Sequence, residues 1–451
     1  MKIVFGIDSI YAKKGQDHPV VWDSTRVINA HMLLVGKSGT GKTFTLRKII
    51  NQIQKSAQSM GSKVLCRIID VHGDINIEGS STVKFSESGV YGFNPLAINP
   101  DPDFGGVRKR IQSFISIINK TSRKLGTKQE PVLRNILLDL YAANGFYEKD
   151  PKSWTINAPD GTRLMHNGRP KKFPTLEDAY RYANFKHKAM FLGTSNKAVL
   201  NLEELNKKAK QLYLKQKNVH KAFNQEEQEK IKGEINNLGQ QAIEAFSNHI
   251  QAIENGMELT DLIKYDSIET IKSIVDRLDS LLATGIFKNH DPEFDPHATI
   301  WRYDIRTLTN LDEKKLFVYF LLEEILLKRI EQGEQDEVVE MVFLDEANLF
   351  FTEDADNIIN IISKEARKFG LGLCCASQSP THFSEDFMSS VGTKIILGLD
   401  QLFWNQSVQK LKIELQALEW IVPHQKMVVQ INNKAELKNR FVWTLLNNNK
   451  S

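Results

Sequence analysis

The stretch LLVGKSGTGKTFTLRKII, residues 33–50, decides the fold. It begins with an apolar run typical of a buried strand, continues through a glycine-rich loop, and leads into a pattern with helical spacing. The loop GKSGTGKT fits G-x-x-x-x-G-K-[ST], with Gly36, Gly41, Lys42 and Thr43 at the defining positions. Because a strand precedes the loop and a helix follows it, a phosphate-binding loop (P-loop) is favoured over a chance glycine turn.

The residues of this loop suit a triphosphate and a magnesium ion. Glycines let backbone N–H groups turn inward around phosphate oxygens, and the N-terminus of the following helix adds its dipole. Lys42 is expected to reach the terminal phosphates, and the Thr43 hydroxyl is expected to bind Mg²⁺. We therefore predict ATP and Mg²⁺ as cofactors. The predicted nucleotide-binding residues are Gly36, Lys37, Ser38, Gly39, Thr40, Gly41, Lys42, Thr43 and Phe44.

A second apolar run, MVFLDE at residues 341–346, ends in two carboxylates. Its four apolar residues carry Asp345 to the tip of a strand, where the side chain can hold Mg²⁺ through water. Glu346 is then placed to polarise an attacking water, although a surface carboxylate is the alternative. A small-molecule kinase needs no such base, because its substrate brings its own nucleophile. The acidic pair therefore favours hydrolysis.

Three more side chains are candidates for catalysis. Gln378 ends the run LGLCCASQ, where it would lie beside Asp345 and direct its amide at the γ-phosphate or the water. Arg367 and Lys368 precede the same run and are candidates to neutralise charge in a phosphoryl transition state. The alternative for both is a cation that merely favours a helix C-terminus next to Gly370.

The stretch IIDVHGD, residues 68–74, places Asp70, His72 and Asp74 at the end of another strand. These three possible ligands suggest a metal site. One histidine and two aspartates in a tight turn are, however, more typical of a hydrogen-bonded turn. We therefore do not predict an independent metal site here.

The order of apolar runs along the chain predicts an α/β fold. Nearly continuous apolar runs, typical of a parallel sheet covered on both faces, occur near the N-terminus and again after about residue 300. The residues between them mostly show helical spacing, and residues 201–254 are expected to form one or two long exposed helices. We predict a core with a mostly parallel sheet from residues 1–104 and 301–451, and an inserted, mostly helical lobe from residues 105–300.

The composition is that of an ordinary globular protein. Of 451 residues, 41% are hydrophobic and 25% are charged, and the net charge of +4 allows a polyanionic partner without demanding one. No apolar run approaches the length of a membrane span, so no direct span is expected. The N-terminus does not resemble a signal peptide, and all three cysteines lie in apolar runs. We therefore expect a cytoplasmic protein.

Together, HMLLVGKSGTGKT, IIDVHGD, VFLDEANLF and ARKFGLGLCCASQSP resemble the motifs of the HerA–FtsK superfamily of P-loop pumping ATPases. YGFNPLAIN and FPTLEDAY are similar to segments of its HerA branch and of the type IV secretion ATPases. The resemblance implies a RecA-like core and a homo-oligomer, usually a hexameric ring that threads DNA. It also implies roles for six residues: Lys42 and Thr43 at the nucleotide and magnesium, Asp345 at magnesium, Glu346 as base, Gln378 as sensor and Arg367 as a finger into a neighbouring subunit's site.

Several functions fit this resemblance. The leading expectation is a DNA-translocating ring ATPase in a DNA-processing or antiphage defence complex, with a nuclease or another effector as partner. The alternatives are a regulatory or scaffold ATPase that gates an effector without moving along DNA, and a motor of a conjugative secretion apparatus. HerA proteins usually carry an N-terminal β-barrel that the short segment before the P-loop does not provide, so a compact variant is expected.

Overall fold

The computed structural model describes residues 1–193, 197–219, 225–252, 264–352, 354, 357–435 and 440–446. The chain forms two compact units. The first consists of Met1–Pro95, Lys120–Ser122 and Thr284–Ser451, and the second of Leu96–Asn119 and Arg123–Ala283. The first border thus falls after residue 95 where the sequence-based boundary was 104, and the last falls after residue 283 where it was 300.

An 11-stranded sheet in the order β2-β1-β13-β12-β11-β3-β10-β9-β4-β8-β5 forms the first unit. The pairs from β11 through β5 are parallel, and those from β11 to β2 are antiparallel, so the mostly parallel sheet is confirmed. The strands are β1 (Lys2–Asp8), β2 (Pro19–Asp23), β3 (Met32–Val35), β4 (Leu65–Asp70), β5 (Ser81–Lys84), β8 (Ile300–Asp304), β9 (Glu340–Leu344), β10 (Leu371–Ser377), β11 (Thr393–Ile396), β12 (Lys426–Ile431) and β13 (Phe441–Leu445).

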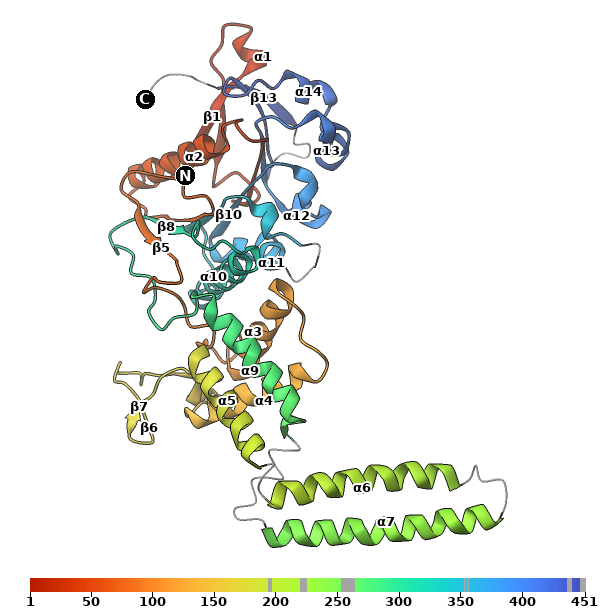
Figure 1. Ribbon diagram of the computed structural model, residues 1–451. Coiled ribbons are helices and arrows are strands. Elements are labelled where there is room, and N and C mark those ends of the chain that lie inside the picture. Colours follow the sequence, from red (N-terminus) through yellow and green to blue (C-terminus); the bar gives the residue numbers. More distant parts are fainter. Residues whose placement is uncertain are drawn as a thin grey trace. The chain divides into compact units, whose positions relative to one another are not determined.

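Both ends of the chain contribute to this sheet. In Figure 1 the first strands (red) and the last strands (blue) are neighbours, because β1 pairs with β13. The P-loop strand β3 lies between β10 and β11, and all four of its residues are buried. The first and last parts of the sequence therefore build one core.

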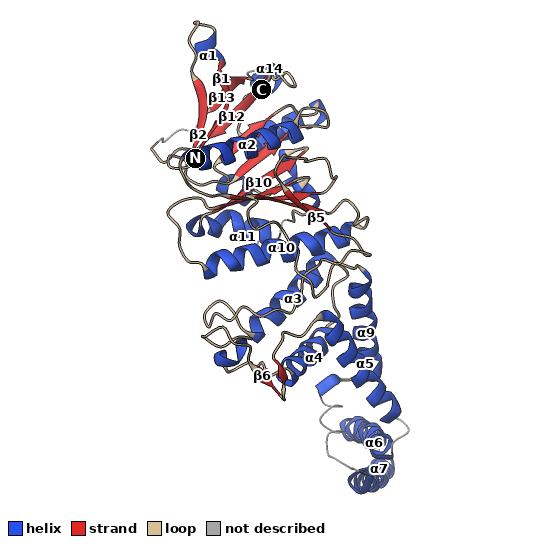
Figure 2. Cartoon of the chain, turned by 90° about the vertical axis from the view of Figure 1, so that its left-hand side faces the viewer, coloured by secondary structure: helices blue, strands red, loops and turns tan. Residues whose placement is uncertain are grey.

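Helices cover both faces of the sheet (Figure 2). Helix α2 (Lys42–Ser59) packs on one face through Leu46, Ile49, Ile50 and Ile53, whose spacing places them on one side of the helix. Helices α10 (Leu311–Glu331) and α11 (Ile358–Glu365) lie on the other face. The remaining helices of this unit are short: α1 (Ser9–Ala12), η2 (Ala347–Leu349), η3 (Ala366–Phe369), η4 (Pro380–His382), α12 (Glu385–Ser390), η5 (Gln401–Phe403), α13 (Trp404–Leu411) and α14 (Leu415–Trp420).

The second unit is mostly helical. Helices α6 (Lys197–Val219) and α7 (Gln225–Ala252) contact each other extensively, which confirms the expected helices within residues 201–254 and shows that they form a hairpin. No helix in the described part of the chain is both apolar enough and long enough to cross a membrane. The elements of this unit are α3 (Val107–Thr121), α4 (Gln129–Ala143), η1 (Pro151–Trp154), β6 (Met165–His166), β7 (Arg169–Pro170), α5 (Leu176–Gly193), α6 (Lys197–Val219), α7 (Gln225–Ala252) and α9 (Ile268–Ala283).

Candidate nucleotide-hydrolysis site

The P-loop is anchored to the ends of the two strands beside β3. The Gly36 N–H donates to the Ser377 carbonyl oxygen at 3.1 Å, and the Lys37 N–H donates to the Gly398 carbonyl oxygen at 2.8 Å. A Cβ on Gly36 would lie 2.4 Å from the Thr40 hydroxyl oxygen, so only glycine fits there. The start of the loop is therefore fixed by the sheet itself.

The rest of the loop has the backbone shape that phosphate binding requires. Gly39 and Gly41 have φ values of +79° and +96°, which glycine adopts without strain. Helix α2 begins immediately afterwards at Lys42, and the Lys42 Nζ donates to the Gly36 carbonyl oxygen at 2.9 Å. The ammonium group thus lies across the mouth of the loop, while the Phe44 side chain is exposed.

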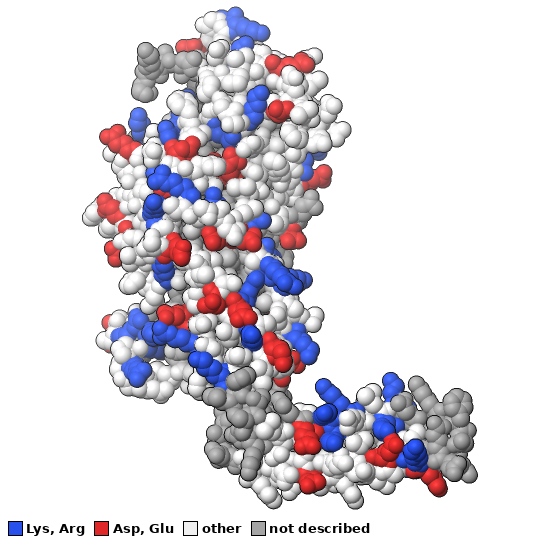
Figure 3. Space-filling model, viewed as in Figure 1, with Lys and Arg blue, Asp and Glu red and all other residues white. Residues whose placement is uncertain are grey.

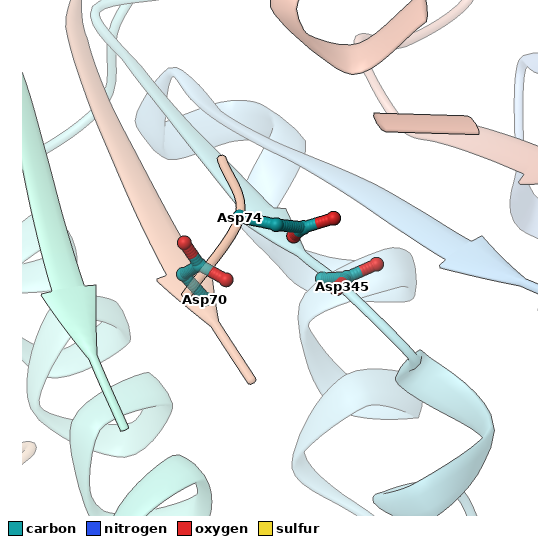
Figure 4. Close-up of side chains that lie close together, drawn as sticks. All are labelled: Asp70, Asp74 and Asp345. Carbon is teal, nitrogen blue, oxygen red and sulfur yellow. The ribbon is translucent and has the colours of Figure 1, made fainter. Parts of the chain in front are cut away.

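Three carboxylates gather next to the loop. Asp70 ends β4, Asp74 lies in the turn that follows, and Asp345 follows β9, as Figure 4 shows. Because β4 and β9 are parallel neighbours, their carboxyl ends meet at one edge of the sheet, and one oxygen from each carboxylate lies within 4.8 Å of the others. The Thr43 hydroxyl is 3.3 Å from Asp74 Oδ2 and joins the cluster to the P-loop.

Asp70 has a structural role in this cluster. It accepts hydrogen bonds from the N–H groups of Gly73 at 2.7 Å and Ile75 at 2.9 Å, and its Oδ2 is 2.7 Å from Arg302 Nη2. Both partners of the ion pair are buried. Asp70 therefore builds a hydrogen-bonded turn, as predicted, and leaves Asp74 and Asp345 available to a cation.

This buried ion pair leads to a stability prediction. Arg302→Met would leave the Asp70 charge buried without its cation, so we expect the free energy of unfolding to fall by about 3–5 kcal/mol. Lys328→Met is the control, since Lys328 pairs with Glu324 on the exposed side of α10 and should cost less than about 1 kcal/mol. Urea unfolding measures both.

The double variant Arg302→Met with Asp70→Asn tests the cause. Asparagine removes the charge but keeps an oxygen for the turn, so the double variant should be more stable than Arg302→Met alone. An Arg302→Met variant as stable as the Lys328→Met control would contradict this account of the ion pair.

Burial shapes the electrostatics of Asp345. Desolvation raises the pKa of this carboxyl to about 6, and the neighbouring Glu346 carboxylate acts in the same direction. A bound divalent cation would favour the charged form. Two carboxylates and one hydroxyl form a hard oxygen donor set, so Thr43, Asp74 and Asp345 fit Mg²⁺. Asp74 was not predicted as a magnesium residue. The available signal was that it follows the end of β4 at Asp70 by four residues, and β4 is the neighbour of the strand that leads to Asp345.

Glu346 and Gln378 lie side by side at the same edge. Strands β9 and β10 are parallel neighbours, and Gln378 Nε2 is 3.4 Å and 3.5 Å from the two carboxylate oxygens of Glu346. From the sequence, Gln378 was expected beside Asp345, and its side chain instead contacts the next residue, Glu346. Glu346 is largely buried and has a φ of +46°, an uncommon conformation for glutamate that is typical of functional sites.

Arg367 lies at the opposite edge of the sheet. It belongs to η3, before β10, whereas Gln378 follows β10, and a seven-residue strand spans roughly 20 Å. The Arg367 side chain is exposed, and among the described residues it makes no hydrogen bond or ion pair. Within one chain, the structure therefore brings together Lys42, Thr43, Asp345, Glu346 and Gln378 but not Arg367.

Comparison with known proteins fits this geometry. The family described as "Helicase HerA, central domain" matches residues 10–325. The chain belongs to this family. The recognition of a HerA-type member of the HerA–FtsK P-loop superfamily is thereby confirmed.

Relatives of the HerA family show how much of the chain is shared. The DNA double-strand break repair helicase HerA of Pyrococcus furiosus is 30% identical over 32% of this chain and 32% of its own length. The protein of the same name from Sulfurisphaera tokodaii is 26% identical over 62% of this chain and 52% of its own. The chain therefore spans about a third and about half of these two relatives.

A solved structure supports the fold at low identity. VirB4 of Thermoanaerobacter pseudethanolicus superposes with a TM-score of 0.62 and 14% identity, and the match covers 98% of this chain and 96% of that one. The chain thus has a fold similar to that of this VirB4, and the predicted RecA-like α/β fold class is confirmed.

Proposed function

We propose that this HerA-family chain is a Mg²⁺-dependent ATPase that works as a homo-oligomeric ring, expected to be a hexamer, and moves DNA. The observation that carries the ATPase proposal is the meeting of the P-loop, the Thr43–Asp74–Asp345 cluster and Glu346 at one edge of the sheet. These groups provide a phosphate cradle, a cation site and a carboxylate base within one site.

Each group has a distinct task in hydrolysis. The N–H groups of the P-loop and the Lys42 ammonium hold the phosphates, with Gly36–Phe44 as the binding segment. Thr43 and Asp345, joined by Asp74, hold Mg²⁺, which offsets phosphate charge when bound. Glu346 takes a proton from the attacking water, and the Gln378 amide orients the Glu346 carboxylate or the water.

The position of Arg367 supports the ring. A guanidinium roughly 20 Å from its own site cannot stabilise charge there, yet it is exposed and has no partner among the described residues. A neighbouring subunit placed head to tail would bring its γ-phosphate to this arginine. Arg367 then links hydrolysis to assembly.

DNA is proposed as the substrate on the basis of the family. The two archaeal relatives are named as DNA double-strand break repair helicases. Figure 3 shows basic and acidic side chains interspersed over the face in view, so charge alone does not locate a DNA path. A nuclease or other effector in a repair or defence complex is the partner that we propose for such a motor. A scaffold ATPase that gates an effector is the second candidate, since the site would hydrolyse ATP equally well without DNA.

The test is ATP hydrolysis with and without DNA. We expect Mg²⁺-dependent phosphate release that rises when duplex or single-stranded DNA is added, because a translocase couples turnover to its track. Lys42→Ala should weaken nucleotide binding about 10- to 100-fold, since it removes a charge-assisted contact to phosphate. Lys55→Ala, an exposed position late in α2, is the matched control and should bind normally.

The outcomes separate the candidates. Turnover that DNA does not change would favour the scaffold ATPase over the translocase. Nucleotide binding that is equally strong in Lys42→Ala and the wild type would contradict the proposed site.

A further inference from the structure

A histidine from far along the chain contacts the tip of the P-loop. His424 lies between α14 and β12, and its Nε2 is 3.0 Å from the carbonyl oxygen of Gly39. Because a carbonyl oxygen only accepts hydrogen bonds, the ring nitrogen is the donor. The contact joins residues 385 positions apart, so no local motif reveals it.

The turn that carries His424 is built to present the ring. The N–H groups of Gln425 and Lys426 donate to the Val422 carbonyl oxygen at 3.0 Å and 2.8 Å, and His424 itself has a φ of +65°. A left-handed backbone is uncommon for histidine and is maintained here by these turn hydrogen bonds. The ring also lies against Gly41, where an added Cβ would be 3.2 Å from its Cε1 and Nδ1.

The tip of the P-loop is the part whose conformation such a contact restricts most. The sheet fixes the start of the loop at Gly36 and Lys37, whereas Gly39 and Gly41 are glycines with positive φ and wide conformational freedom. A Cβ on Gly39 would have no other atom within 4 Å, so the tip projects into open space. Holding the tip in one conformation would pre-orient its N–H groups for phosphate.

We propose that His424 is a positioning residue that holds the P-loop tip in its nucleotide-binding conformation by donating a hydrogen bond to Gly39. The inference rests on the proposed ATPase function and adds a residue of the C-terminal segment to it. His424 contacts the loop at Gly39 and Gly41, whereas Asp345 and Glu346 follow β9. Its loss therefore acts on nucleotide affinity and leaves the chemical step unchanged.

Three substitutions separate the hydrogen bond from packing. His424→Asn tolerates the left-handed backbone but is too short to reach Gly39. His424→Leu fills space without a donor, and His424→Gln places an N–H donor at a comparable distance. In His424→Asn and His424→Leu we expect the Kd for a fluorescent ATP analogue and the KM for ATP to rise about 3- to 10-fold, with kcat unchanged. The Kd and KM of His424→Gln should stay close to the wild-type values.

Each outcome decides the question. The thermal unfolding temperature without nucleotide should be unchanged in His424→Asn, and it should fall slightly and equally in His424→Leu and His424→Gln, because both side chains strain the left-handed backbone. Wild-type nucleotide affinity in His424→Asn and His424→Leu would overturn the donor role, and so would an equal loss of affinity in His424→Gln and His424→Leu. A fall in kcat with unchanged KM would also overturn it. A wild-type chain that fails to bind the analogue would instead overturn the proposed function, and with it this inference.

Discussion

Glu346→Gln should bind ATP and almost stop hydrolysing it. The amide keeps the size of the side chain but cannot accept a proton, so we expect kcat to fall about 10²- to 10⁴-fold. Nucleotide affinity should persist because Lys42, Thr43 and Asp345 remain. The Glu346 charge contributes to the raised pKa of Asp345, so its removal should favour the charged form of Asp345. Phosphate release and equilibrium binding measure the two properties separately.

Glu385→Gln is the matched control for this variant. Glu385 is an exposed glutamate in the first turn of α12, and the same chemical change there should leave kcat within about twofold. Turnover of Glu346→Gln at the wild-type rate would show that the base assignment is wrong. Loss of nucleotide binding together with turnover would point instead to a structural role for Glu346.

Arg367→Ala should abolish ATP hydrolysis in a ring, although it leaves the nucleotide site of its own subunit intact. An arginine that enters a neighbouring site contributes about 10³- to 10⁵-fold to turnover, and we expect a loss of that order with ATP binding retained. Mixing this variant with Lys42→Ala should restore part of the activity, because some interfaces would pair an intact P-loop with an intact arginine. Sedimentation on the same samples reports whether a ring forms.

Lys368→Ala serves as the control, because it is exposed and adjacent to Arg367 in the same η3 turn. It should retain most of the activity. Failure of the mixture to recover, despite demonstrated subunit exchange, would contradict the role between subunits. Full activity in a monomer would contradict it as well. If Arg367 only stabilises the end of its helix, Arg367→Ala should lose little ATPase activity.

Local motifs made the P-loop and the two strands that lead to the candidate residues Asp345, Glu346 and Gln378 predictable. The run around Gly36–Thr43 specifies its own strand, loop and helix, and the apolar residues before Asp345 and Gln378 indicate buried parallel strands. Strand β8 was not predicted, because Arg302 interrupts its apolar pattern and its burial depends on Asp70 from another strand. Strand β5 was missed because it has four residues and buries only Val83.

Long-range contacts account for what the sequence did not show of the site. Asp74 lies near Asp345 only because the sheet order places β4 beside β9, and sheet order is not a local property. His424 contacts the P-loop from near the other end of the chain for the same reason. The separation of Arg367 from Gln378 was predictable, since both flank one strand and the rise per residue of a strand is fixed.

The placement of β3 also constrains how the protein is made. This strand leaves the ribosome long before its partner β10, which follows 342 residues later, as the pairing of Met32 with Cys374 shows. At a translation rate of about 5–20 residues per second, roughly 20 s to a minute passes between the synthesis of β3 and that of β10. During that time the nascent chain exposes an unpaired, hydrophobic edge, and such edges bind chaperones or aggregate. Slow synthesis or a truncated message would therefore harm this protein more than a chain whose sheet is built from successive strands.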